Sequence, residues 1–333
     1  MTDINKNEIK RIPKNPLGKV ANTLSITKKL LDEISNREPN DDFRVPIPDE
    51  AFQEYLKDIG VSVENGTVAY GDVKNIEKIA CSIDIFLFSE IEDIEWPRGH
   101  VDNWEIKSLD GLKYFKNLRF LSCSRHQISK LDVSNNNKLE YLSCYSNQLN
   151  TLDLSKNDNL KELNCCYNEL TTLDVSKNFS LRVLNCSSNK LSTLDVSNND
   201  KLEEFICFIN QLSTLDVSNK DKLILLFCWE NQLTYLDVSN NDKLEKLYCS
   251  RNQLTTLDVS NNFSLRVLNC SSNQLNSLDV SNNLKLENLS VYENQLATLN
   301  LLKNTDLCFL AWDRNKISSI DFSNNPKLPQ KHR

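Results

Sequence analysis

The sequence predicts a solenoid, a stack of short coils joined through parallel strands, and three observations lead to that prediction. Leucine recurs every 21 residues from Leu118 to Leu328, and ten full units run from Leu118 to Lys327 without an insertion. Their consensus is L-x-x-L-x-C-x-x-N-x-L-x-x-L-D-V-S-x-N-x-x. The segment 178–189 also reappears letter for letter at 262–273, which indicates a block duplication. A fixed period of this length is typical of repeat proteins, in which each unit buries its apolar face against its neighbours.

Each unit has two similar halves. When a unit is numbered from its first leucine, positions 1, 4 and 6 point inward around a short strand, as Leu139, Leu142 and Cys144 do in the second unit. Asn147, at position 9, stands where the chain must turn, and its amide can satisfy backbone groups of the loop and of the next coil. The second half repeats the pattern and turns at Asn157. We therefore expect extended segments on both faces and a narrow, mildly curved coil.

These units resemble the leucine-rich-repeat superfamily. Their length and pattern are similar to the bacterial IRREKO class, in which L-x-x-L-x-L-x-x-N is followed by L-x-x-L-D-L-x-x-N. The resemblance implies a leucine-rich-repeat solenoid of the β-rich or α+β repeat class, with a mildly curved parallel-strand coil and a helical N-terminal cap. It also implies a binding scaffold, because known members mostly serve as scaffolds, many of them in secreted or surface proteins.

Composition excludes several classes of function. The 333-residue chain has a net charge of −7 with both signs interspersed, which argues against a nucleic-acid partner. No run approaches ~18 apolar residues, so we expect no membrane span. Residues 1–11 are polar and lack the apolar stretch of a secretory signal, so the expected location is the cytoplasm, with a secreted or surface location as the alternative if the native start lies upstream. An odd number of cysteines, 11, fits a reducing compartment better than a disulfide scaffold.

The array is preceded by a half-unit and by a different kind of sequence. Residues 106–117 form a half-unit one residue longer than the others, as expected for a capping half-repeat with a short helical turn. Upstream, Pro48-Asp49 precedes a predicted helix over 50–59. We therefore divide the chain into a polar segment (1–42), an N-terminal cap (43–105), the solenoid (106–328) and a tail (329–333).

The predicted cap resembles the N-terminal cap of bacterial leucine-rich-repeat proteins, in which IPD-x-x-F-x-x-x-L precedes a loop like that of an EF-hand. When the loop is aligned on Gly66, its first and third positions are Val61 and Val63. Calcium needs oxygen ligands at both positions. We therefore expect a cap that covers the first coil and no calcium site.

The polar segment contains one amphipathic stretch. Its apolar residues fall on one helical face at Val20, Leu24, Thr27, Leu31 and Ile34. Three interpretations stay open for this segment: a helix packed on the cap, a docking helix offered to a partner, and disorder.

Two polar columns could carry chemistry, and both have a structural explanation. Position 6 is cysteine in eight successive units, from Cys123 to Cys270, but it points into the core, where a thiol behaves as a small apolar group. A straight column cannot offer zinc four tetrahedral ligands, and adjacent parallel strands give poor disulfide geometry. Position 15 is aspartate in nine of ten units, with Asn300 as the exception, and an aspartate beside a turn accepts bonds from nearby backbone N–H groups. With scattered histidines and no nucleophile motif, we expect neither a metal, nor a cofactor, nor an enzyme.

The candidate binding surface is found where the repeat does not dictate the residue. Positions 5 and 7 point outward from the first strand. Most units place Ser or Asn at position 5, but the fifth to seventh units place large apolar residues there, and the fifth and sixth also do so at position 7. A contiguous exposed apolar patch with a charged rim is typical of a protein interface. The candidate residues are Ile206, Phe208, Ile209, Leu225, Phe227, Trp229 and Tyr248, with Tyr145, Tyr167 and Tyr292 at either side and Glu230 and Arg251 at the edge.

The leading hypothesis is thus a protein-binding scaffold with another protein as partner. A second copy of the chain and the N-terminal helix are alternative occupants of the patch. A regulatory adaptor or toxin-neutralising protein that docks an enzyme through its N-terminal helix is a second functional hypothesis. A surface adhesin is a third, provided that the native start carries a signal sequence.

Overall fold

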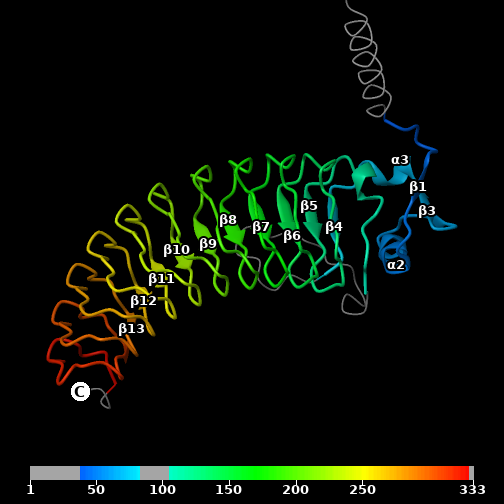
Figure 1. Ribbon diagram of the computed structural model, residues 1–333. Coiled ribbons are helices and arrows are strands. Elements are labelled where there is room, and N and C mark those ends of the chain that lie inside the picture. Colours follow the sequence, from blue (N-terminus) through cyan, green and yellow to red (C-terminus); the bar gives the residue numbers. More distant parts are fainter. Residues whose placement is uncertain (1–37, 83–104, 330–333) are drawn as a thin grey trace, which may run out of the picture.

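The protein, described by a computed structural model over residues 38–82 and 105–329, is the predicted solenoid (Figure 1). Eleven parallel strands form one sheet in the order β14-β13-β12-β11-β10-β9-β8-β7-β6-β5-β4, so that each strand pairs with the next one along the chain. The strands are β4 (Lys78–Ala80), β5 (Phe120–Ser122), β6 (Tyr141–Ser143), β7 (Glu162–Asn164), β8 (Val183–Asn185), β9 (Glu204–Ile206), β10 (Leu225–Phe227), β11 (Lys246–Tyr248), β12 (Val267–Asn269), β13 (Asn288–Ser290) and β14 (Phe309–Ala311).

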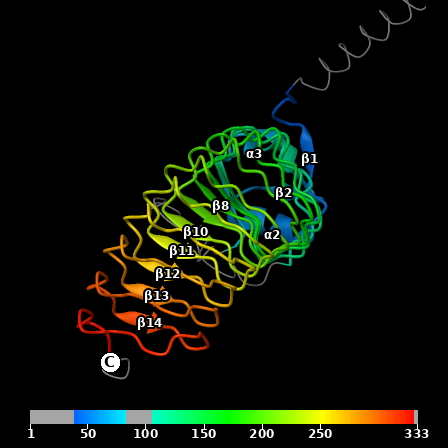
Figure 2. The same cartoon turned by 60° about the vertical axis from the view of Figure 1, so that its left-hand side comes forward.

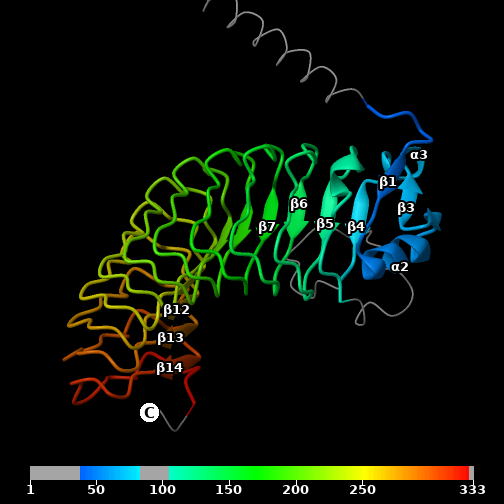
Figure 3. The same cartoon turned by 45° about the vertical axis from the view of Figure 1, so that its right-hand side comes forward.

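The hydrogen-bonded strands lie in the first half of each unit, and extended segments in the second half stay a prediction. In the described coils the second half of each unit contains turns and no strand, because the chain reverses after position 15. Backbone hydrogen bonds also join the second halves of neighbouring coils, such as that from the Gln211 N–H to the Leu191 carbonyl oxygen at 2.8 Å, but only the first halves form a sheet at strand spacing. The solenoid bends, and the strands of its C-terminal coils lie on the inner side of the bend (Figures 1 and 3). Figure 2 shows the coils stacked one behind another.

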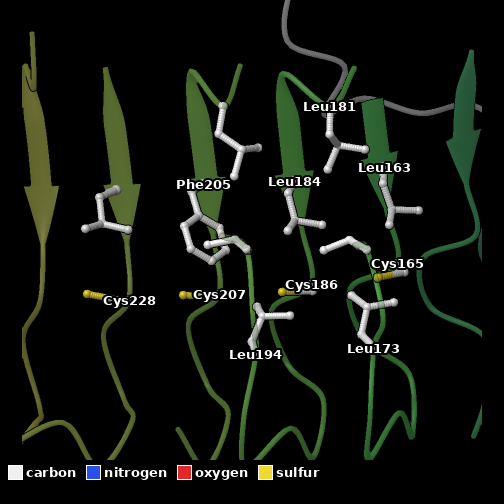
Figure 4. Close-up of a cluster of buried hydrophobic side chains, with 14 of the residues drawn as sticks. Leu163, Cys165, Leu173, Leu181, Leu184, Cys186, Leu194, Phe205, Cys207 and Cys228 are labelled. Atoms are coloured by element: carbon white, nitrogen blue, oxygen red, sulfur yellow. The ribbon is translucent and has the colours of Figure 1, made fainter. Parts of the chain in front are cut away.

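The core is built from the leucine and cysteine columns (Figure 4). Strand register places position 4 of each unit beside position 4 of the next, so Phe205, Leu226 and Leu247 are neighbours. The cysteines of position 6 follow directly after the strands and are fully buried, as the sequence predicts. Burial raises the pKa of the Cys228 and Cys270 thiols to about 12, so these groups stay protonated at neutral pH. A protonated, buried thiol is a poor nucleophile and a poor metal ligand.

The asparagines of position 9 tie neighbouring coils together as predicted, but they reach the preceding coil rather than the next one. Asn210 Nδ2 donates to the carbonyl oxygens of Cys186 (3.1 Å) and Cys207 (3.2 Å), in the preceding coil and its own. Its Oδ1 accepts from the Leu191 backbone N–H at 3.0 Å. In the first unit His126 replaces the asparagine, and its Nε2 lies 3.2 Å from the Cys81 carbonyl oxygen. One asparagine side chain thus satisfies three backbone groups that neither strand nor turn reaches.

The aspartates of position 15 hold the second turn, also as predicted. Asp216 Oδ1 accepts from the Ser218 backbone N–H at 2.9 Å, and the corresponding bond recurs along the column. Asn300 keeps this bond without the charge, since its Oδ1 accepts from the Leu302 N–H at 3.1 Å. The aspartate column therefore supplies hydrogen-bond acceptors to the backbone N–H groups of the turn.

A third polar column lies at position 19 and has one exception. Asn199 Nδ2 donates to the carbonyl oxygens of Val175 (3.0 Å) and Asn178 (2.9 Å) in the preceding coil. In the fifth unit this position is Lys220, whose side chain is buried. Its ammonium instead donates to Asn219 Oδ1 at 2.5 Å and lies 3.8 Å from Asp200 Oδ1. Burial lowers the pKa of Lys220, which shows that the site disfavours the charge.

The N-terminal end packs against the first coil. The segment contains β1 (Arg44–Pro46), α2 (Glu50–Asp58), β2 (Val63–Glu64), β3 (Thr67–Ala69) and α3 (Tyr70–Val73), and its strands form an antiparallel sheet in the order β1-β3-β2. Asp49 begins α2 as predicted: its Oδ1 accepts from the Phe52 N–H at 2.9 Å. Its Oδ2 accepts from the Lys107 and Ser108 N–H groups, at 2.8 and 3.0 Å, and so ties the helix to the half-unit.

The loop compared with an EF-hand is a β-hairpin. β2 and β3 pair antiparallel, and Asn65 and Gly66 between them have φ angles of 49° and 72°. An Asn-Gly pair with left-handed φ angles is the preferred two-residue hairpin turn. The requirement for Gly66 therefore comes from the hairpin.

The solenoid sheet begins earlier than the boundary at residue 105 expected from the sequence. β4 pairs parallel with β5, and Cys81 follows β4 as Cys123 follows β5. The segment Ile76–Cys81 (IEKIAC) matches positions 1, 4 and 6 of a unit, and this signal in the sequence was missed. The half-unit 106–117 contains the expected helical turn as the 3₁₀ helix η1 (Leu112–Tyr114). The predicted N-terminal helix with Val20 and Ile34 lies outside the described residues.

Replacing Lys220 by asparagine is expected to stabilise the protein. The amide nitrogen introduced at this position would reach the carbonyl oxygens of Val196 and Asn199, following the pattern of the column, and the change would remove a buried cation. Two restored hydrogen bonds correspond to about 1–2 kcal/mol. Urea unfolding of Lys220→Asn should therefore show a higher midpoint with an unchanged m-value. The matched control, Asn199→Lys, should lower the midpoint, and a stabilised control would contradict this account of the column.

The aspartate column predicts a defined acid sensitivity. The backbone N–H of Ser218, and secondly its hydroxyl, lower the pKa of Asp216, so the folded state favours the carboxylate. This contribution to stability is present above the unfolded pKa of about 4 and is lost as pH falls through the lower folded value. Asp216→Asn should keep the turn, as Asn300 does, and should reduce the loss of thermal stability between pH 5 and 3. Asp216→Ala should destabilise the protein at pH 7, and equal stability of both variants there would refute the assignment.

The core position of the cysteine column predicts low thiol reactivity. Ten of the eleven cysteines are buried and Cys308 is exposed. The Ellman reagent should therefore titrate one thiol in the native protein and all of them in denaturant. Cys186→Val should cost no more than about 1.5 kcal/mol, because it is close to a volume-conserving core substitution. Rapid native labelling of several thiols would contradict the packing assignment.

Candidate protein-binding surface

The outward positions of β9, β10 and β11, and the residues that follow β9 and β10, carry the predicted apolar side chains together on one face. Phe208 and Trp229 stack with their ring centroids 4.3 Å apart and an interplanar angle of 14°. Phe227 and Tyr248 meet edge to face at 4.6 Å and 70°. Both geometries are favoured between aromatic rings. We name these four residues, with Ile206, Leu225 and Ile224, the central patch.

Two members of the patch are less exposed than the sequence suggested. Ile206 and Leu225 are only 3% and 7% exposed, because neighbouring coils at strand spacing let large side chains cover one another. They form the floor on which the aromatic side chains lie. Phe208, Phe227, Trp229 and Tyr248 are partly exposed and form its surface.

Ile209 lies next to the patch in a strained backbone conformation. Position 8 has a positive φ in every unit, and φ is 49° at Ile209. Most other units place Ser, Arg or Glu there. A β-branched residue in the left-handed region costs of the order of 1–3 kcal/mol and persists where other interactions or a function require it.

The rim and the flanking tyrosines differ in how they relate to the patch. Glu230 and Arg251 form an ion pair at its edge, as expected for a charged rim. Tyr167 is exposed and Tyr292 half-buried, with the Arg314 guanidinium 5.2 Å from the Tyr292 ring centroid. Tyr145 is only 5% exposed and offers little surface to a partner. Serines and Cys166 at position 7 separate the flanking tyrosines from the patch, so the three do not extend it.

Sequence reasoning missed two residues of this surface. Position 2 is charged in eight of the ten units and forms ion pairs between coils, such as Glu140 with Lys161 at 2.6 Å. In the sixth unit it is Ile224, which is 40% exposed and extends the patch toward this edge. Glu204, at position 3 of the fifth unit, lies between Val183 and Leu225 in the sheet. The break in the charged column was visible in the sequence, whereas the environment of Glu204 depends on pairing.

Over residues 38–82 and 105–329 there is no group of three or more His, Cys, Asp or Glu side chains that could hold a metal ion. Nor does this part of the chain include a helix with the length and apolar character that a membrane crossing requires. What the patch offers is aromatic area with a charged edge, the composition of a protein interface.

Comparison with known proteins agrees with this class of fold. The chain is similar to the functional domain of InlJ from Listeria monocytogenes, which includes a cysteine ladder, with 32% identity and a TM-score of 0.71 over 85% of this chain and 63% of that one. It is also similar to the leucine-rich-repeat protein LIC12759 from Leptospira interrogans, with 26% identity and a TM-score of 0.61 over 66% and 61%. An internalin, InlF from Listeria monocytogenes, has 21% identity and a TM-score of 0.58 over 87% and 98%, and shows the fold alone.

The fold is thus a leucine-rich-repeat solenoid, and these structural neighbours are bacterial leucine-rich-repeat proteins. The chain spans less than two thirds of the length of the first two. No known protein family and no curated protein matches the sequence.

Proposed function

We propose that the protein is a non-enzymatic scaffold that binds another protein through the central patch. The single observation that carries this proposal is the replacement of Ser and Asn by a contiguous aromatic and aliphatic cluster on outward positions of three neighbouring coils. Such clusters rarely stabilise a monomer and commonly mark interaction sites.

We also propose two assignments within the leucine-rich-repeat fold, one for the repeat class and one for the N-terminal cap. We assign the units to the 21-residue IRREKO-like class and the segment from β1 to α3 to the N-terminal caps of bacterial leucine-rich-repeat proteins. The consensus and the packing of α2 against the first coil support both assignments. Delivery to an enzyme through the N-terminal helix and a role in surface adhesion rank behind the patch, because no described residue argues for either.

A paired substitution tests the patch. Phe227→Ser with Trp229→Ser should abolish partner binding and leave the melting temperature nearly unchanged, since serine is common at these positions in other units. Central aromatic anchors commonly contribute about 2 kcal/mol or more each to binding. The measurement is recovery of partners from cell extract by the intact chain and by the variant, followed by titration of each recovered protein.

The inward pair in the same coil is the matched control. Leu226→Ser with Cys228→Ser buries two hydroxyls and creates cavities, so it should lower the melting temperature strongly. If the outward variant unfolds while the inward one does not, the two faces have been assigned the wrong way round. If the outward variant stays folded and binds every recovered partner normally, the patch is not the binding surface.

A further inference from the structure

Glu204 lies inside the central patch with one carboxylate oxygen unsatisfied. It begins β9, and pairing places Val183 on one side of it and Leu225 on the other, both at the same position of their units. Its Oε2 atom is buried and has no hydrogen-bond partner, and it is the one carboxylate oxygen in this state among residues 38–82 and 105–329. Glu204 as a whole is half-buried, so part of its side chain reaches the surface of the patch. Ile206, two residues further along the strand on the same face, is part of the floor of the patch.

The charged groups around Glu204 do not supply the missing partner. Arg182 is the nearest arginine along the neighbouring strand and already pairs with Glu203 at 2.9 Å. Lys246 lies two strands away at the same position as Glu204, beyond Leu225, and only its charge acts on the carboxyl. Burial raises the pKa of Glu204 more than Lys246 and Arg182 lower it, and Glu203 raises it further.

An unpaired carboxylate among apolar side chains opposes folding. The charged form loses part of its hydration, and its buried Oε2 receives no hydrogen bond in return, which costs free energy of folding. An apolar residue at this site, as in the flanking Val183 and Leu225, would avoid that cost. A charged residue at an otherwise apolar site, without a contact that compensates it, is the kind of departure expected at functional sites.

We propose that Glu204 binds the guanidinium of an arginine that the partner protein inserts across the central patch. This inference rests on the proposed function and names the chemistry that the patch recognises. The planar cation would lie against Leu225 and Phe227, which pair with Glu204 and Ile206 in the sheet, and would donate hydrogen bonds to the carboxylate of Glu204. Arginine is preferred over lysine because its flat, weakly hydrated group both stacks on rings and donates two parallel bonds to a carboxylate.

The proposed binding combines charge complementarity with apolar surroundings. The carboxylate selects a cation, and the surrounding apolar area excludes water and strengthens the pair. A partner without a cation at that point would leave the Glu204 oxygen unpaired after docking, which gives discrimination as well as affinity. The rim pair of Glu230 and Arg251 is already internally balanced and does not compete for the same cation.

Selection from a random peptide library on the full-length protein tests the inference. Wild-type protein should enrich peptides that combine an arginine with apolar residues, and their binding should require Phe227 and Trp229. Selection on Glu204→Gln, which keeps shape and removes charge, should lose the arginine enrichment. For one selected peptide, replacing arginine by glutamine should weaken binding to the wild type about tenfold or more, the loss expected for a hydrogen bond between charged groups. The same replacement should change binding to Glu204→Gln little.

The control is Glu203→Gln at the neighbouring residue, whose carboxylate is already paired with Arg182. It should leave the arginine preference intact. Glu204→Gln should also melt at the same or a higher temperature than the wild type at pH 7, because it removes the charge from a half-buried group with an unpaired oxygen. A structural role for Glu204 would instead lower the melting temperature.

The outcomes separate the two proposals. Peptides that depend on Phe227 and Trp229 but carry no arginine would overturn the role of Glu204 and leave the proposed function standing. A selection that yields no peptide dependent on those two residues would overturn the proposed function itself. Equal arginine enrichment on wild type and on Glu204→Gln would also overturn the role of Glu204.

Discussion

The structure depends on one constraint: every backbone polar group buried between two coils needs a partner in the next coil. Strand pairing and further backbone bonds between neighbouring coils, such as that from the Cys207 N–H to the Phe227 carbonyl oxygen, satisfy many of these groups. The side-chain amides of the position 9 and position 19 asparagines satisfy carbonyl groups that these bonds leave over. These amides must sit at a fixed distance from carbonyl groups one unit away, so any insertion in a unit would displace all of them. That requirement explains why the period is held over ten units.

The same constraint divides each coil into positions that are dictated and positions that are free. Leucine, cysteine, asparagine and aspartate at fixed places are needed for the coil to close and stack, and they leave the outward strand positions to vary. Units five to seven use that freedom for aromatic and aliphatic residues, and the sheet brings them into one surface. The rigid stack holds this surface without a loop or a hinge, as suits a binding site built on regular elements.

Two departures from the repeat have opposite meanings. Lys220 breaks the asparagine column inside the stack, and nothing in the structure explains why a lysine stands there. Glu204 breaks the neutral character of its neighbours on the open face, where a partner can reach it. Both place a charge where the fold disfavours it, yet only Glu204 lies among residues that have a reason to meet another molecule.

The sequence by itself determined the period, the inward columns, the roles of Asn147 and Asp216 and the start of α2, because all of these are local patterns repeated at a fixed interval or read from a single cap. Tertiary structure alone decided that strands occupy one side of the stack, that Ile76–Cys81 joins the solenoid sheet, and that Ile206 is covered while Phe227 stays partly exposed. Tertiary structure also decided that Glu204 lies between apolar side chains, since its neighbours Val183 and Leu225 belong to other coils. Burial of an outward side chain depends on what the neighbouring coils place beside it, and that information is not local to any unit.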